Sequence, residues 1–196
     1  MSSVRTLTLA DVAFPRAGAL RDILLVTGAS LVTALAAQIA IPVPGSPVPI
    51  TGQTFAVLLS GMLLGPRRAF LAQALYLAEG AAGLPVFAGG AAGLARILGP
   101  TGGYLIAFPF AAALTGVLAA RGWDRRFVTT LAAMLLGSAV IFAVGLLGLA
   151  RFVPAPQVLA AGLLPYLPGD LLKATLAALA FPPAWRRLHD RGGIGA

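Results

Sequence analysis

The chain has 196 residues, of which 59% are hydrophobic and only 10% are charged, and its formal net charge is +8. Soluble domains carry about 25% charged residues, and disordered chains are poor in apolar residues and rich in charge, so both classes are excluded. Together with a mean hydropathy of +0.92, this composition predicts a protein that is surrounded mostly by lipid.

Six apolar runs along the chain predict six membrane-spanning helices, since a spanning helix needs about 20 apolar residues. Residues 1–22 are mixed in polarity and are interpreted as an N-terminal tail, and residues 186–196 as a C-terminal tail. The runs between the tails are Ile23–Ile41, Ile50–Gly65, Ala69–Leu84, Tyr104–Ala120, Phe127–Leu149 and Gly169–Trp185. The predicted fold class is therefore an all-α membrane protein with a single membrane domain over residues 23–185.

Several of these runs are short for a bilayer. A helix of 16 residues, such as Ile50–Gly65, rises about 24 Å, whereas the hydrocarbon core is about 30 Å thick. The proline-rich stretch 42–49 cannot continue a helix, because proline lacks the amide donor, and residues 89–93 are rich in glycine. Irregular backbone at membrane depth survives only when it is buried in protein or lines a cavity. These connections therefore indicate a pocket.

The basic residues predict the orientation of the chain in the membrane. With six spans, one side of the membrane receives both termini and two arginine-rich turns, and it holds 11 of the 14 basic residues. These are Arg5, Arg16, Arg21, Arg67, Arg68, Arg121, Arg125, Arg126, Arg186, Arg187 and Arg191. The positive-inside rule makes this side cytoplasmic. Membrane orientation therefore accounts for the net charge, and nucleic acid is not expected as a partner.

The residue types that are absent or rare exclude several chemistries. The chain has no cysteine, and its one histidine, His189, lies in the C-terminal tail, which argues against a Cys/His metal site or a Ser-His-Asp triad within the membrane. The only lysine, Lys173, follows two leucines and not a glycine-rich loop. A Walker A motif is therefore missing, and the chain does not hydrolyse ATP by P-loop chemistry.

Charged residues at membrane depth are the first candidates for function, because they are costly there and usually face a cavity or a partner. Asp170 and Lys173 lie three residues apart on one helical face, beside a helix N-terminus whose dipole favours anions. The alternative is that Asp170 caps the helix and pairs with Lys173. Arg96 either approaches a ligand or faces water from its loop. Glu79 is either a pocket wall or a partly solvated residue near a helix end.

Uncharged side chains add further candidates. Gln53 and Thr54 follow the proline-rich loop and either line a pocket or cap the second span. Tyr104 and Phe87 either belong to an aromatic belt at the membrane interface or pack against a flat apolar ligand.

Small residues at four-residue spacing, Ala29, Thr33 and Ala37, mark one face of the first span. Such a face lets helices approach closely in lipid. It serves either packing within the chain or docking of another membrane subunit.

Five segments of the sequence are distinctive when they are taken together. They are residues 47–54 (PVPITGQT), 64–68 (LGPRR), 83–87 (GLPVF), 99–104 (GPTGGY) and 168–173 (PGDLLK). In this order they resemble the BioY family, the biotin-specific substrate-binding (S) components of energy-coupling factor (ECF) transporters. The resemblance runs from about Ile23 to Trp185.

The resemblance implies the six-helix S-component fold, with biotin bound near the outer surface beneath the first connecting loop and no cofactor. It also implies a multi-pass protein of the bacterial cytoplasmic (inner) membrane. The implied partners are a transmembrane coupling protein and cytoplasmic ATPases, and homo-oligomers are left open. The family's aspartate, lysine and arginine correspond to Asp170, Lys173 and Arg96, whereas Glu79 matches no family motif. The implied docking face for the coupling protein is the small-residue face of the first span, with Ala29, Thr33 and Ala37.

Three alternatives stay open at this point. The chain could be an S component for another vitamin, such as thiamine or riboflavin. It could be an intramembrane transferase that uses Asp170 as a base, although a supporting histidine or metal cluster is missing. It could also be a structural membrane subunit that binds no ligand.

Overall fold

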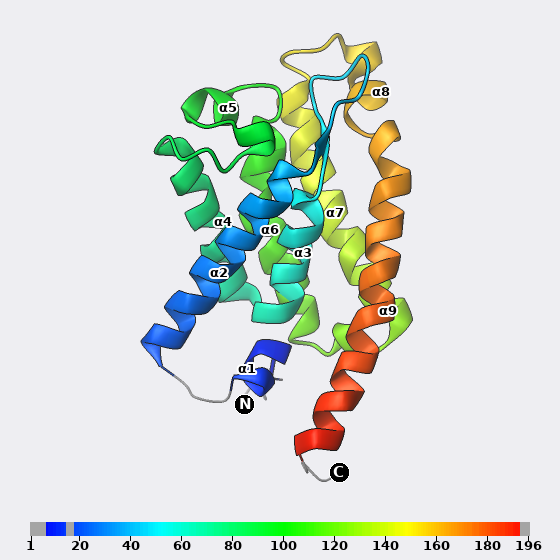
Figure 1. Ribbon diagram of the computed structural model, residues 1–196. Helices are drawn as coiled ribbons and strands as arrows, with labels where there is room; N and C mark the ends of the chain where they lie inside the picture. Colours follow the sequence, from blue (N-terminus) through cyan, green and yellow to red (C-terminus); the bar gives the residue numbers. More distant parts are fainter. Residues whose placement is uncertain (1–6, 15–17, 193–196) are drawn as a thin grey trace, which may run out of the picture.

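Six helices of 12 residues or longer dominate the computed structural model, which describes residues 7–14 and 18–192, with side chains up to residue 188. They are α2 (Ala19–Gln38), α3 (Gln53–Leu64), α4 (Pro66–Ala81), α6 (Gly102–Ala119), α7 (Phe127–Leu149) and α9 (Leu167–Gly192) (Figure 1). By length and composition α2, α6 and α7 can each cross a membrane, and α3 is a shorter apolar helix. The six predicted spans thus correspond to six long helices. Arg5, Arg16 and the side chains of His189 and Arg191 lie outside the described part.

Short elements connect the long helices. A two-stranded antiparallel hairpin, β1 (Ala40–Ile41) and β2 (Ile50–Thr51), links α2 to α3. The remaining short elements are α1 (Leu9–Ala13), η1 (Ala88–Gly90), α5 (Leu94–Leu98), η2 (Trp123–Arg125), η3 (Ala155–Gln157), α8 (Val158–Gly162) and η4 (Leu164–Tyr166). The hairpin, α5 and α8 gather at one end of the bundle, while α1 and both ends of the chain lie at the other (Figure 1).

Helix extends into both predicted tails, past the tail boundaries at residues 22 and 186. In the N-terminal region, α1 forms and α2 begins at Ala19. The last helix continues beyond Trp185 to Gly192, across Pro182 and Pro183. Trp185 is buried, and its Nε1 donates a hydrogen bond to Asp124 Oδ2 at 2.6 Å. This tertiary contact stabilises a helical continuation that the proline pair alone does not predict.

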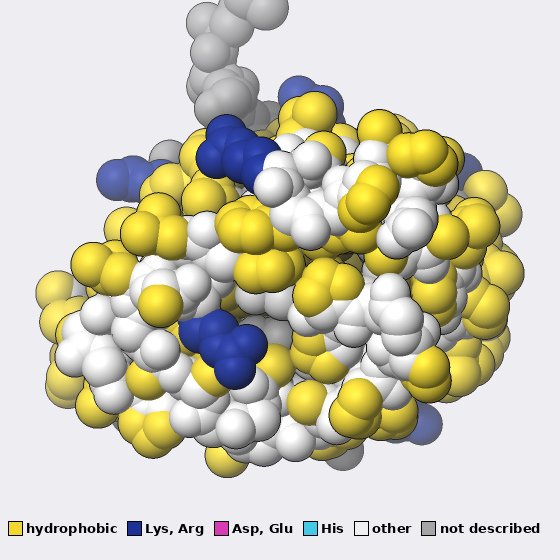
Figure 2. Space-filling view, turned by 90° about the horizontal axis from the view of Figure 1, so that it is seen from above, with side chains coloured by type: hydrophobic (Ala, Val, Ile, Leu, Met, Phe, Trp, Pro, Cys, Tyr) yellow, Lys and Arg dark blue, Asp and Glu magenta, His cyan; other side chains and the backbone are white. Residues whose placement is uncertain are grey.

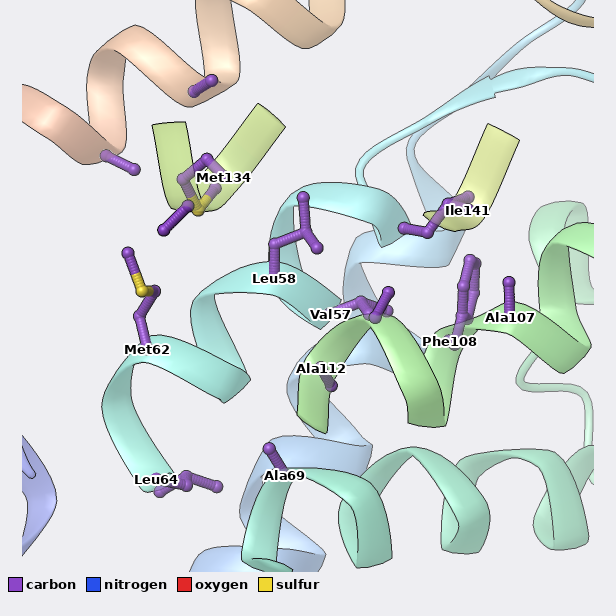
Figure 3. Close-up of a cluster of buried hydrophobic side chains, with 14 of the residues drawn as sticks. Val57, Leu58, Met62, Leu64, Ala69, Ala107, Phe108, Ala112, Met134 and Ile141 are labelled. Carbon is purple, nitrogen blue, oxygen red and sulfur yellow. The ribbon is translucent and has the colours of Figure 1, made fainter. Parts of the chain in front are cut away.

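The core forms around α6, which packs against α3, α4 and α7. Of the apolar window of α6, 67% is buried, against 17% for α2, so α6 is central and α2 peripheral. Figure 3 shows Leu58 of α3, Phe108 of α6 and Ile141 of α7 within this cluster. The helices approach very closely at Gly61, where a Cβ atom would lie 1.9 Å from Thr115 Oγ1.

Acidic side chains attach the N-terminal segment to the arginine-rich end of the bundle. Asp11 pairs with Arg21 and, at 2.8 Å, with Arg68, which also pairs with Asp22 at 2.8 Å. Burial raises the pKa of Asp11, but hydrogen bonds from Arg68, Arg21 and Thr8 outweigh burial and hold that pKa well below its usual range. The charged form of Asp11 therefore holds α1 against the bundle.

Candidate functional site

A cavity of about 920 Å³, counted to its open mouth, lies at the end of the bundle opposite the chain termini. Its polar lining comprises Thr51, Gln53, Thr54, Arg96, Thr101, Tyr104, Tyr166, Asp170 and Lys173. Most of the remaining lining is apolar and includes Val48, Ile50, Phe87, Leu105, Phe108, Ile141 and Phe142. Figure 2 looks onto this end, where apolar and uncharged side chains surround a hollow with basic side chains beside it and no acidic side chain in view.

Asp170 and Lys173 both line the cavity, but they do not form the local ion pair that the sequence left open. Asp170 is 9% exposed, and its Oδ1 accepts a hydrogen bond from Ser138 Oγ of α7 at 2.8 Å. Lys173 Nζ donates to Thr51 O at 2.8 Å and to Thr54 Oγ1 at 3.1 Å. Each charge is thus held by a neighbouring element, and within the described part of the chain Asp170 Oδ2 and the third N–H of the Lys173 ammonium have no hydrogen-bond partner.

Gln53 positions the wall of the cavity between the hairpin and α4. Its Oε1 accepts a hydrogen bond from Thr51 Oγ1 at 3.0 Å, and its Nε2 donates to Tyr76 OH. Tyr76 OH in turn donates to Val86 O at 2.9 Å. This chain of hydrogen bonds connects β2, α3 and α4 with the loop that carries Phe87. Gln53 is the first residue of α3 and does not cap it with its side chain; its own amide donates to Thr51 Oγ1 at 3.3 Å.

The other predicted cavity residues lie at its mouth and side walls. Arg96 lines the mouth from α5 and is exposed to solvent. Tyr104 is buried, and its OH donates to Gly162 O of α8 at 2.8 Å. Phe87 is 2% exposed and packs edge-on against Tyr76. The aromatic-belt alternative therefore fails for Tyr104 and Phe87, because both rings are inside the protein.

Glu79, included among the predicted binding residues, does not line the cavity. It is half-buried on α4, and its Oε2 accepts a hydrogen bond from Ser30 Oγ of α2 at 2.6 Å. The side chain thus connects α2 and α4 and is not part of the cavity lining. Its spacing within α4 could not reveal this, because the neighbour is a serine 49 residues earlier in the chain.

The residues predicted for docking a partner lie at the contact between α2 and the rest of the chain. Thr33 and Ala37 are fully buried, and Gln73 Nε2 of α4 donates to Thr33 Oγ1 at 3.2 Å. Ala29 is partly buried and packs against the core. The structure thus uses this face for packing within the chain. The docking role stays a prediction, and the burial of Thr33 and Ala37 counts against it.

Sequence reasoning missed several cavity residues. Ile141 and Phe142 of α7 face the cavity, as does Leu105 of α6, but in sequence they are ordinary members of long apolar runs. Ser138, which holds Asp170, carries a weak signal as a polar residue within the most apolar helix. Its pairing with Asp170, 32 residues away, depends on how α7 and α9 pack.

Comparison with known sequences decides the family. A sequence profile described as the BioY family matches residues 5–190, nearly the whole chain. The chain belongs to the BioY family. BioY proteins in other organisms align with most of its length. It is 44% identical to a "Probable biotin transporter BioY" of Pyrococcus horikoshii over 147 residues, which is 75% of this chain and 85% of that protein. It is 41% identical to a "Biotin transporter BioY" of Rhodobacter capsulatus over 165 residues, covering 77% and 85% of the two chains.

Comparison with solved structures confirms the BioY fold. The chain resembles the crystal structure of the S-component for biotin from an ECF-type ABC transporter, with a TM-score of 0.74 and 29% identity. The match covers 88% of this chain and 93% of that one. The predicted all-α S-component fold is therefore correct.

Proposed function

We propose that the chain is the biotin-binding S component of an ECF-type transporter and takes part in biotin uptake. Its BioY family membership and the names of its relatives support this function. Within the molecule, the observation that carries it is a largely apolar cavity with one carboxylate and two cations in its wall. Biotin offers an apolar bicyclic body, two ureido N–H donors and a carboxylate, which match these groups. The chain is a transport subunit and not an enzyme, and its function needs no cofactor.

The charges in the cavity favour one orientation of the ligand. Asp170 is nearly buried and, as a carboxylate, accepts hydrogen bonds only, so it suits the ureido N–H groups and repels a second carboxylate. Arg96 stands exposed at the mouth, where a guanidinium can bind a carboxylate in two parallel hydrogen bonds. Biotin therefore enters with its ureido ring toward Asp170 and keeps its carboxylate near Arg96, while Lys173 donates to the ligand between them.

Capture occurs from the outer side of the cytoplasmic membrane. The positive-inside rule supports this orientation, because the arginine-rich turns lie at the end with the termini, opposite the cavity. The energy for inward release comes from partners, a transmembrane coupling protein and cytoplasmic ATPases, since the chain carries no Walker A motif. Lipid surrounds the exposed apolar side chains of the long helices.

Two measurements test this proposal. Isothermal titration of the purified chain should detect one biotin site, and neither thiamine nor riboflavin should bind. In cells that cannot make biotin, the chain expressed with a coupling module should restore uptake of labelled biotin. A chain that bound thiamine or riboflavin but never biotin would be an S component for another vitamin.

A further inference from the structure

A cluster of hydrogen bonds joins the tip of the first connecting loop to the segment before α9. Ser46 lies in that loop, between β1 and β2, and its Oγ lies 2.6 Å from Ala161 O at α8. Tyr166 of η4 donates from its OH to Val48 O of the same loop. These contacts join segments more than 100 residues apart, across the mouth of the cavity. We call Ser46, Val48, Ala161 and Tyr166 the latch.

Each of the two hydroxyl groups of the latch donates a hydrogen bond to a backbone carbonyl in the other's segment. Each hydroxyl has one hydrogen. Tyr166 OH uses its hydrogen for Val48 O, and Ser46 OH uses its hydrogen for Ala161 O. Ser46 Oγ also accepts a hydrogen bond from the Val48 amide at 3.0 Å and lies 2.9 Å from Tyr166 OH. Each carbonyl also lies within reach of the second hydroxyl, since Ser46 Oγ is 3.3 Å from Val48 O and Tyr166 OH is 3.2 Å from Ala161 O. Removing one hydroxyl thus leaves two carbonyls to share a single hydrogen, and removing both leaves the loop without these bonds to α8 and η4.

Tyr166 has a second role, because its ring lines the cavity and packs against Phe142 with ring centroids 6.5 Å apart. One face of the residue therefore meets the ligand while its hydroxyl holds the loop. Val48 is 8% exposed and also lines the cavity, whereas Ser46 does not line it. A ligand in the cavity contacts the Tyr166 ring and holds it in the position from which its hydroxyl reaches the loop.

We infer that Tyr166 is a positioning residue that couples occupancy of the cavity to closure of the 42–49 loop, and that the latch sets the rate at which the ligand leaves. This inference rests on the proposed function for the identity of the ligand, which is a small amphipathic molecule such as biotin. The latch itself is formed without a ligand, so the attachment of the loop can be measured independently of biotin binding.

The test uses Ser46→Ala and Tyr166→Phe in the full chain. Tyr166→Phe keeps the ring against the ligand, and Ser46→Ala changes no residue of the cavity wall. Both should raise the biotin dissociation rate constant about tenfold, the effect of one neutral hydrogen bond of about 1.4 kcal/mol, with a much smaller change in the association rate constant. The double variant should release biotin faster than either single variant, because no hydroxyl then remains for either carbonyl. Thr175→Val is the matched control, because the Thr175 hydroxyl bonds only to Leu171 O within α9.

A ligand-free measurement separates failure of the latch from failure of the proposed function. Hydrogen–deuterium exchange in the 42–49 segment should be faster in both latch variants than in the wild type and in Thr175→Val. In Ser46→Ala the Val48 amide loses its acceptor, and in Tyr166→Phe the loop loses its bond to η4. Unchanged exchange in both variants would overturn the latch whatever the ligand is, and unchanged dissociation despite faster exchange would overturn its role in ligand release. A wild type that failed to bind biotin while the variants showed faster exchange would support the latch and contradict only the proposed ligand.

Discussion

Replacing Lys173 with methionine tests the charged part of the site most severely. Methionine is similar in length and apolar, so it fills the same space without any donor. In the structure two of the three N–H groups of Lys173 are donated to Thr51 O and Thr54 Oγ1. The third is left for the ligand. We expect Lys173→Met to weaken biotin binding by about 10- to 100-fold.

This magnitude follows from the contacts. A hydrogen bond to a charged group contributes about 1.5–3 kcal/mol, and each 1.4 kcal/mol is about tenfold in affinity. The direct bond to the ligand therefore accounts for about one to two orders of magnitude. The two bonds to the protein are lost from the free and the bound states alike, so they affect stability more than affinity.

Titration calorimetry on the purified variant provides the assay, with thermal unfolding of the ligand-free protein beside it. Leu172→Met is the matched control, because it introduces the same residue one position earlier on the exposed side of α9, where Leu172 is 61% exposed. A Lys173→Met protein with wild-type affinity and normal folding would refute the reasoning. In that case the lysine only ties α9 to the hairpin.

Three further predictions concern other parts of the molecule. Arg96→Gln should weaken binding of biotin several-fold in titration but leave binding of biotin methyl ester unchanged; an equal loss for both would contradict the assigned orientation. Gly61→Ala should destabilise the protein by about 1–3 kcal/mol, because its Cβ would lie 1.9 Å from Thr115 Oγ1. Gly28→Ala is the control and should be tolerated, because the space around Gly28 is open. Equal melting temperatures for the two variants would refute the close approach of the helices at Gly61. Hydrogen bonds from arginines lower the Asp11 pKa and outweigh the effect of burial. The attachment of α1 should therefore be complete at pH values above the usual aspartate pKa near 4, and it should weaken as the pH falls below that value. Proteolysis near residues 7–14 that did not accelerate in acid would contradict this.

The sequence predicts the helical frame well, because the apolar runs and the proline and glycine breaks act locally. Phe127–Leu149 was predicted to the residue, and Gly65-Pro66 separates α3 from α4 through a glycine at φ +79° followed by a proline in the first helical turn. The continuation of α9 beyond the apolar run is not predictable in this way, because it depends on the burial of Trp185 against Asp124, a contact between residues 61 positions apart.

The site was predictable to the extent that charge at membrane depth is rare. Asp170, Lys173 and Arg96 were found on that ground, and all three line the cavity. The same rule failed for Glu79, because a helix–helix hydrogen bond with Ser30 also accommodates a charge in the membrane. Four-residue spacing could not distinguish packing within the chain from docking, since both need small residues at a close contact.

The ligand itself is tested most directly by mass spectrometry of the small molecules that are released from the gently purified wild-type chain. The account predicts biotin, at close to one molecule per chain when the cells are grown with biotin. A different vitamin in its place, or an empty protein that fails to take up added biotin, would contradict it.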